Sequence, residues 1–361
     1  MLKRQNLSKI MNFKQELDKR VSLSPLYQKL DNLSIRCLAC AHKCIIHEGK
    51  RGICQIRFNK KGQLYAPNGY VSSLGLDPIE KKPFFHIMPG AGTLSYGMLG
   101  CNFKCPFCQN HAISQIFDDS GSTGDFHDIE PSQIIDQAVN EKAKIIVSTY
   151  NEPTITSEWS FEIFKLASEK KIKTAYVSNG YASEEVLTFL MPHLNFINID
   201  LKTFNRENYS QVIGGKLENV LFTIKKAYEM GLWIEIVTLL IENFNTDEAQ
   251  LNSMAEFIAN ISPDIPWHIS AFHPSYKMID KPATPETIIR KAFKIGKEKG
   301  LKYVYAGNIQ TSDMENTYCP KCGQLLVERN YYSIGKFNIK PKDKKNGECP
   351  KCGTSIPGIW F

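Results

Sequence analysis

The chain has 361 residues, 42% of them hydrophobic and 22% charged, with a formal net charge of +7. This length exceeds what one hydrophobic core usually spans, so we expect one enzyme-sized domain with smaller appendages. No run approaches the roughly 18 apolar residues that a membrane helix requires, and the N-terminus has no apolar export signal, so we expect a cytoplasmic protein and no membrane span.

Charge and cysteine are unevenly distributed along the chain. Residues 1–60 hold 13 Lys or Arg against 4 Asp or Glu. Such a basic surface suits RNA or an acidic redox protein, or it is a solvated face without a partner. The 11 cysteines are an odd number at close spacings, so metal sites explain them better than disulfides. They form three groups, which predict an N-terminal Cys-rich lead-in at 1–90, a βα core at 91–312 and a separate C-terminal module at 313–361.

The first cysteine group has the spacing C-x2-C-x3-C-x9-C. Its members are Cys37, Cys40, Cys44 and Cys54. Four thiolates can close a zinc site or hold a second iron–sulfur cluster that relays electrons, and spacing alone does not select between zinc and iron. His42 and His47 are also close enough in sequence to be ligands. We predict a metal site here, either structural zinc or a cluster, followed by turns and short strands up to residue 90.

Between residues 91 and 312, short apolar runs alternate with amphipathic helical patterns, which is typical of βα units around a parallel sheet. The predicted strands are TLSYGML, KIIVSTY, KTAYVS, NFINID, WIEIVTLL, WHISAF and KYVYAG. The predicted helices lie near 131–140, 157–169, 183–191, 216–230, 246–260 and 284–299. Pro131 suits a first helical turn, and Gly231 and Gly300 suit helix ends. The pattern predicts an α/β fold, a partial (β/α)6-type TIM barrel that is open, with its chemistry at the C-terminal ends of the strands.

The second cysteine group lies directly after the first predicted strand of this core, in GCNFKCPFCQN. Thiolates are the usual ligands of iron–sulfur clusters, and Cys101, Cys105 and Cys108 would hold three irons of a [4Fe-4S] cluster and leave the fourth open. A zinc site completed by a histidine such as His111 is the alternative. The C-x3-C-x2-C spacing, with Phe107 before the last cysteine, resembles the signature loop of the radical S-adenosylmethionine (SAM) superfamily.

Polar residues follow the next two predicted strands. Asn151 and Glu152, in STYNEPT, stand where the superfamily has a Gly-Gly-Glu-Pro-like motif. The resemblance implies that Glu152 receives the methionyl ammonium group of SAM, with Asn151 in place of the commoner glycine. Ser178 and Asn179 suit the ribose hydroxyls or the carboxylate of SAM, or they form a plain turn.

Later strand ends supply further candidates. Asp200 and Lys202, in IDLK, resemble the D-x-K element of glycyl-radical-enzyme activases, although such a pair also forms structural salt bridges. We expect both in the site. His268, His273 and Asn308 stand at or near the last two strand ends and are candidates for the substrate pocket, although a histidine there is often structural.

The third cysteine group consists of two C-x2-C knuckles, each followed by glycine, with 26 residues between them. Its members are Cys319, Cys322, Cys349 and Cys352. Two knuckles supply the four thiolates of a closed tetrahedral site, so we predict a zinc-ribbon-like tail with structural zinc. An auxiliary iron–sulfur cluster and free thiols are the alternatives.

The motifs taken together resemble one family from about residue 37 to the C-terminus. They are CLACAHKC, GMLGCNFKCPFCQN, TYNEPT, IDLK, PWHISAFHPSYKM, YVYAGN and CPKCG. The chain resembles the AmmeMemoRadiSam-system radical SAM enzyme, which is similar to pyruvate formate-lyase activating enzymes. The resemblance implies reductive cleavage of SAM at a [4Fe-4S] cluster, giving a 5′-deoxyadenosyl radical for hydrogen abstraction. It also implies that Phe107 contacts the adenine.

The resemblance further implies partners. The electron donor would be a flavodoxin or ferredoxin, and the family's genes accompany those of AMMECR1-like and Memo-like proteins, either of which could be the partner or the substrate. Two alternatives stay open. One is the same radical chemistry acting on a small molecule or RNA. The other is a zinc-ribbon RNA-binding protein, which would leave the βα core and its polar strand ends unexplained, so nucleic acid is not the expected partner.

Overall fold

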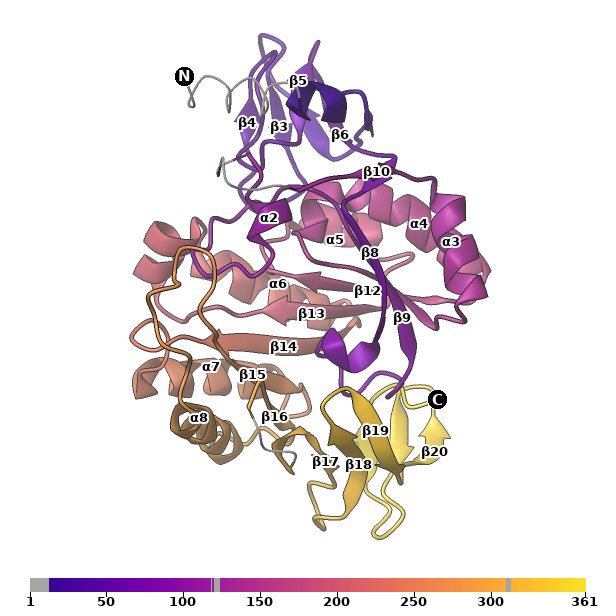
Figure 1. Ribbon diagram of the computed structural model, residues 1–361, viewed down its shortest axis with the longest axis vertical. Helices are drawn as coiled ribbons and strands as arrows, with labels where there is room; N and C mark the ends of the chain where they lie inside the picture. Colours follow the sequence, from indigo (N-terminus) through magenta and orange to yellow (C-terminus); the bar gives the residue numbers. More distant parts are fainter. Residues whose placement is uncertain (1–12, 118, 120–123, 310–312) are drawn as a thin grey trace.

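The computed structural model describes residues 13–117, 119, 124–309 and 313–361 (Figure 1). Its centre is an eight-stranded sheet in the order β16-β15-β14-β13-β12-β11-β9-β8. Strands β9 and β11 to β16 run parallel, whereas β8 pairs antiparallel with β9. The bounds are β8 Ser73–Pro78, β9 Gly92–Gly97, β11 Ile145–Ser148, β12 Lys173–Ser178, β13 Phe196–Asp200, β14 Trp233–Leu240, β15 Trp267–Ala271 and β16 Val304–Gly307. Strands β8 and β16 are the two edges, so the predicted open, mostly parallel α/β sheet is confirmed.

Six helices connect the parallel strands. They are α3 Pro131–Asn140, α4 Ser157–Glu169, α5 Glu184–Leu190, α6 Leu217–Glu229, α7 Glu248–Ile261 and α8 Glu286–Glu298. Pro131 is the first residue of α3, inside a capping box of Glu130 and Gln133. Gly231 and Gly300, just past α6 and α8, have φ of 81° and 92°, which glycine adopts without steric cost. The helices therefore begin and end close to the predicted residues.

Shorter helical turns complete the core. They are η1 Ile79–Lys81, α2 His111–Ser114, η2 Pro153–Thr156, the π-helical turn η3 Asn208–Ile213 and η4 Asp313–Glu315. Within the described residues, no helix combines the length and the apolar character that crossing a membrane would demand.

Short strands form the N-terminal part of the structure. They are β1 Val21–Leu23, β2 Tyr27–Lys29, β3 Ile35–Cys37, β4 Ile45–Ile46, β5 Phe58–Lys60, β6 Gln63–Pro67 and β7 Tyr70–Val71. They make the sheets β1-β6-β5 and β2-β3-β4, and β7 pairs with β10, His127–Asp128. Ile35 and Leu64 belong to the same hydrophobic core as Leu94 and Ile146 of the central sheet, so this part is packed onto the central sheet.

Short strands were predicted before residue 90, but the place of β8 at the edge of the central sheet was not. This strand precedes residue 90, yet it pairs with β9 from Ser73 opposite Gly97 to Pro78 opposite Gly92. Its sequence, SLGLDP, contains Gly, Asp and Pro, which are depleted in strands, so local propensity gave no signal. The three-module division stays a prediction, but the segment before residue 90 contributes to the central sheet.

The tail forms two three-stranded sheets, β17-β18-β19 and β20-β21-β22. Their strands are β17 Thr317–Tyr318, β18 Leu325–Asn330, β19 Ser333–Phe337, β20 Lys340–Asp343, β21 Asn346–Glu348 and β22 Ser355–Pro357. Leu326, Ile356 and Trp360 form a core together with Tyr305 of β16 and Tyr303 just before it. Figure 1 shows the N-terminal strands and the yellow tail at opposite ends of the molecule.

Candidate functional site

The C-terminal ends of five neighbouring parallel strands surround one cavity of about 190 Å³. The loop after β9 supplies cysteines to it, and the ends of β11, β12, β13 and β14 supply the rest of the wall. The predicted residues that line the cavity are Cys101, Cys105, Phe107, Cys108, Asn151, Glu152, Asn179, Asp200 and Lys202. The sequence motifs are therefore brought together at the edge of the sheet where parallel α/β folds hold their ligands.

The three central thiols lie on one loop in different environments. Cys105 is buried, whereas Cys101 and Cys108 are half-buried. Burial raises the pKa of Cys105 to about 12, and the Lys202 ammonium opposes that shift. Phe103 N–H donates to Cys101 Sγ at 3.4 Å. Binding to a metal would deprotonate these thiols and make this N–H···S contact charge-assisted.

Glu152 is the most heavily hydrogen-bonded side chain of the cavity. Its Oε1 accepts from Thr154 N–H at 3.0 Å, Thr154 Oγ1 at 2.8 Å and Ser178 Oγ at 2.8 Å, and its Oε2 accepts from Asn179 N–H at 2.7 Å. Burial raises the pKa of Glu152, and these donors oppose the rise. Because Oε2 has a single donor, it keeps an acceptor position for a ligand.

Asn151 and Ser178 hold the strand ends in place. Asn151 Oδ1 accepts from Met98 N–H at 3.0 Å, which ties the end of β11 to the end of β9. Ser178 is 1% exposed, and its hydroxyl both donates to Glu152 and accepts from Gly180 N–H. Both side chains are therefore engaged within the chain, and Ser178, unlike its neighbour Asn179, is not among the residues that line the cavity.

Asp200 and Lys202 form an ion pair at the end of β13. Lys202 Nζ lies 3.1 Å from Asp200 Oδ2. Burial opposes the charge of Lys202, but the Asp200 carboxylate and then the Cys105 thiol raise its pKa, so it remains an ammonium group. A permanent positive charge beside Cys105 would stabilise a thiolate there.

A second cavity of about 570 Å³ adjoins the first. The two share the wall residues Gln109, Val177, Asp200 and Leu239. The second extends along β14 to β16 toward the tail, where Tyr331 and Tyr332 line it. A ligand bound in one cavity would therefore lie next to a ligand bound in the other.

The structure distinguishes among the three predicted substrate-pocket residues. His268 and Asn308 line the second cavity, whereas His273 is exposed on the loop after β15 and lines neither cavity. His268 Nε2 donates to Glu235 Oε2 at 2.6 Å. Although burial opposes ionisation of Glu235, this hydrogen bond keeps its pKa low. In neutral His268 the other ring nitrogen, Nδ1, then carries the lone pair.

Comparisons with known proteins agree with this geometry. Residues 96–253 match the model of the Radical SAM superfamily. An uncharacterized protein of Methanocaldococcus jannaschii is 40% identical over 309 residues, which cover 85% of this chain and 91% of that protein. The chain belongs to the radical SAM superfamily. Membership implies SAM and a [4Fe-4S] cluster as cofactors.

Two further relatives of this radical SAM chain are more distant. The isethionate sulfite-lyase activating enzyme of Nitratidesulfovibrio vulgaris is 21% identical, over 32% of this chain and 40% of that enzyme. A solved domain of pyruvate-formate lyase-activating enzyme from Bacteroides vulgatus is 22% identical with a TM-score of 0.40, over 45% of this chain and 98% of that one.

The residues present fit the cofactors of a radical SAM protein. Three thiols on one short loop face a cavity that also holds a buried carboxylate, Glu152, and an ammonium group, Lys202. Among the described residues, Cys101, Cys105 and Cys108 do not gather their sulfurs within 4.8 Å of one another. Three thiolates can bind three irons of a [4Fe-4S] cluster and leave the fourth iron open to SAM, so the donor set fits such a cluster.

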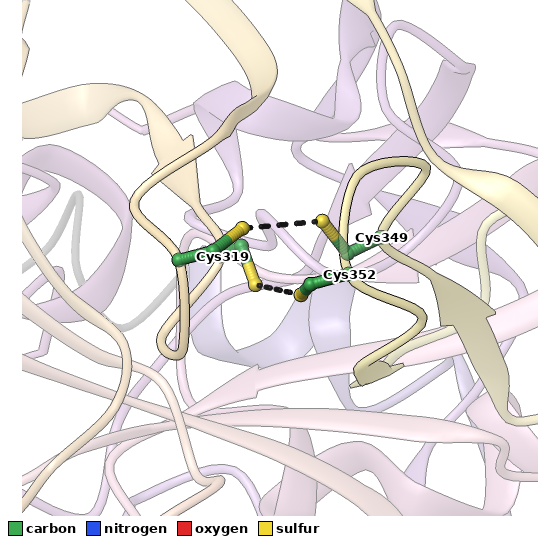
Figure 2. Close-up of side chains that lie close together, drawn as sticks. Cys319, Cys349 and Cys352 are labelled. Atoms are coloured by element: carbon green, nitrogen blue, oxygen red, sulfur yellow. Dashed lines mark hydrogen bonds between the residues drawn. The ribbon is translucent and has the colours of Figure 1, made fainter.

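The tail cysteines of the radical SAM chain converge on one point. The Sγ atoms of Cys319, Cys322, Cys349 and Cys352 all lie within 4.8 Å of one another. Figure 2 shows sulfurs of the two knuckles facing each other, with 3.6 Å from Cys319 to Cys352 and 3.7 Å from Cys322 to Cys349. Gly323 and Gly353, both at φ 70°, close matching turns in which their N–H groups donate to Cys319 O and Cys349 O. The set has the geometry of a four-thiolate metal site.

The N-terminal cysteines do not converge on one point as the tail cysteines do, within the described residues. Cys37, Cys40 and Cys54 are buried and Cys44 is half-buried. In the part of the chain that the structure describes, no three of them gather within 4.8 Å. They therefore lack the convergence of the tail set, and the metal predicted for them stays a prediction.

Several residues of the site carried no recognisable signal in the sequence. Asn102 accepts from Asn179 Nδ2 at 2.7 Å, and Tyr209 OH accepts from Lys202 N–H at 3.2 Å. Glu235, the hydrogen-bond partner of His268, lies inside β14, where its sequence neighbours indicate only a strand. For Asn102 alone, the position in the sequence could have indicated a role in the site, because a residue between two cluster cysteines is held close to any bound cluster.

Proposed function

We propose that this chain is a radical SAM enzyme of the AmmeMemoRadiSam-system family, with a [4Fe-4S] cluster at Cys101, Cys105 and Cys108 and SAM in the adjoining 190 Å³ cavity. When bound, these cofactors supply a 5′-deoxyadenosyl radical that abstracts a hydrogen atom from the substrate. The observation that supports this most is the meeting of the cysteine loop with Glu152 and Lys202 around one cavity. No other constellation of the described residues unites these groups at strand ends.

The protein's own residues bind and orient SAM in this proposal. Glu152 Oε2 receives the methionyl ammonium group, because it is a buried carboxylate with a free acceptor position. Phe107, 4% exposed and 5.6 Å from Phe244 between ring centroids, offers an apolar wall for the adenine. Asn179 lines the same cavity and faces the ribose or carboxylate of SAM, whereas Asn151 and Ser178 position the strand ends.

The substrate occupies the second cavity, which shares a wall with the first. This keeps the hydrogen that is abstracted close to SAM and away from water. His268 and Asn308 supply hydrogen-bonding groups there. Activating enzymes among the relatives support a protein substrate, and an AMMECR1-like or Memo-like protein is the proposed partner, with flavodoxin or ferredoxin as the electron donor. The alternative function is modification of a small molecule or RNA by the same radical chemistry. A screen of candidate substrates would distinguish it from modification of a protein.

The decisive test is SAM cleavage. Protein reconstituted anaerobically with iron and sulfide, reduced with dithionite and given SAM, should release 5′-deoxyadenosine. The Cys105→Ala variant should release none, whereas Cys322→Ala, a matched change in the tail, should retain the activity. Wild-type protein that binds no iron and releases no product, with zinc in all cysteine sets, would refute the proposal and favour a zinc-binding protein.

A further inference from the structure

The N-terminal cysteine set packs against the loop that carries the central cysteines. A Cβ on Gly100 would stand 3.3 Å from Cys54 O. His42 Nε2 lies 3.0 Å from Asn102 O. Gly100 and Asn102 flank Cys101 in the sequence, so two cysteine sets that are distant along the chain are neighbours in space.

Asn102 places an unpaired donor between the two sets. Tyr181 N–H donates to Asn179 Oδ1, so Asn179 Nδ2 faces Asn102 Oδ1 at 2.7 Å, and this fixes the orientation of both amides. Asn102 is 1% exposed, and its Nδ2 has no hydrogen-bond partner among the residues described. The Asn102 side chain lies beside the Cys40 thiol. A buried N–H without an acceptor is costly, and a thiolate or cluster sulfide would satisfy it.

The spacing of the sulfurs separates the N-terminal set from the tail set. Four tail sulfurs gather within 4.8 Å, as the ligands of one ion must, whereas the central and N-terminal sulfurs do not within the described ranges. The N-terminal cysteines are nevertheless neighbours in space. Cys37 N–H donates to Cys44 O at 2.9 Å, and a Cβ on Gly52, two residues before Cys54, would stand 3.7 Å from Cys44 Sγ.

Nearby side chains leave the four thiols as the available ligands. His42 is bonded to Asn102 O, and His47 Nδ1 lies 2.9 Å from Ser34 Oγ, so both histidines already have partners. The Arg57 guanidinium, which is also close to Cys37 and Cys54, is paired with the buried Glu158 carboxylate.

We propose that Cys37, Cys40, Cys44 and Cys54 hold a second [4Fe-4S] cluster adjacent to the cluster at Cys101. The inference rests on the proposed function only for that first cluster. Asn102 is a positioning residue between the two, with Oδ1 toward Cys101 and its side chain also beside Cys40. An external one-electron protein donor reduces the second cluster, which is then oxidised by one electron as the first is reduced by one.

Metal content tests the site directly. Wild-type protein purified anaerobically should contain about eight irons and about one zinc per chain. Cys40→Ser and Cys44→Ser should each hold about four irons and keep the zinc, and the triple Cys101/Cys105/Cys108→Ser variant should also hold about four. Cys322→Ser, the matched control in the tail, should lose zinc and keep about eight irons. Wild-type protein with about four irons and about two zincs would overturn the proposal.

Electron paramagnetic resonance tests the adjacency on wild-type protein, without relying on any variant to fold. Full reduction should give a broadened signal from two coupled clusters, which should sharpen to one isolated cluster in Cys40→Ser. Two uncoupled signals would refute the contact through Asn102. A triple central variant that keeps about four irons, beside a wild type that cleaves no SAM, would retain this inference and reject the proposed function. A triple central variant with no iron, beside a wild type that cleaves SAM, would reject this inference and retain the proposed function.

Discussion

At the residue scale, Glu152 joins the ends of two neighbouring strands and still faces the cavity. It follows β11, and its carboxylate accepts from Ser178 and Asn179 at the end of β12 and from Thr154 on its own side. Four donors around one buried carboxylate favour its ionised form, although burial raises its pKa. The same group therefore shapes the cavity and offers a negative charge to a cationic ligand.

Replacing Glu152 tests both roles. In Glu152→Gln an amide NH2 takes the place of one carboxylate oxygen and meets a donor, so SAM affinity should fall roughly tenfold to a hundredfold and the protein should lose about 1–3 kcal/mol of unfolding free energy. Isothermal titration of reconstituted protein and urea unfolding measure the two effects. Glu169→Gln, on the exposed side of α4, is the control. Loss of stability with unchanged SAM affinity would reduce Glu152 to a structural role.

At the scale of elements, a buried ion pair ties the N-terminal strands to α4. Arg57, just before β5, donates to both carboxylate oxygens of Glu158 at 2.6 and 2.8 Å, to Ile155 O at 3.0 Å and to Ser24 Oγ at 2.8 Å. The two charged side chains are 1% and 5% exposed. Burial opposes the charge of Glu158, but Arg57 keeps its pKa below the usual range. The N-terminal part is thus anchored by a buried charge pair in which both carboxylate oxygens of Glu158 and both terminal nitrogens of Arg57 are hydrogen-bonded.

Removing one member of the Arg57–Glu158 pair should therefore lower the stability of the protein strongly. Arg57→Met leaves Glu158 buried and unpaired, and we expect the unfolding free energy to fall by about 3–5 kcal/mol in denaturant titrations. The double variant Arg57→Met/Glu158→Leu should regain most of that loss, because no charge is left uncompensated. Arg290→Met, which breaks the exposed pair with Glu286 on α8, should change stability by less than about 1 kcal/mol. Equal effects at both sites would contradict the anchoring role.

At the scale of the whole molecule, the tail is docked on the α/β core through buried polar groups. His86 Nδ1 donates to Pro357 O at 2.7 Å, and its Nε2 accepts from Tyr305 OH at 2.7 Å. Arg329 of β18 is 1% exposed and donates to Phe85 O at 2.6 Å. The tail therefore shares a core and hydrogen bonds with the α/β core, and its Tyr331 and Tyr332 line the second cavity.

This docking should make the molecule sensitive to acid. Burial lowers the pKa of His86 from 6.5 to about 4, against the opposing charge of Glu235. Between these values the unfolded chain binds a proton that the folded chain does not, so stability falls as the pH falls from about 6.5 to about 4. From pH 7 to pH 5 the wild type should lose about 2 kcal/mol more unfolding free energy than His86→Gln. His273→Gln, at an exposed site, should behave as wild type, and identical pH slopes for His86→Gln and wild type would disprove the assignment.

Much of the fold and part of the site follow from local patterns. Apolar runs, Pro131, Gly231 and Gly300 delimit strands and helices because they act within one turn or one strand. The cysteine spacings and the strand-end motifs predict a cluster loop and a polar edge, because parallel strands bring their C-terminal ends to one side. Lys202 and Glu152 share a cavity for the same reason.

Tertiary structure decided what depends on contacts between distant segments. Strand β8 has weak propensity of its own and exists because β9 pairs with it. His268 and His273 look alike in sequence, but only His268 lies on a strand beside a buried carboxylate, whereas His273 is two residues past the strand end and exposed. The neighbouring positions of Cys40 and Cys101, and the unpaired Asn102 Nδ2 between them, likewise arise from packing of the N-terminal segment onto the central sheet, which no local pattern encodes.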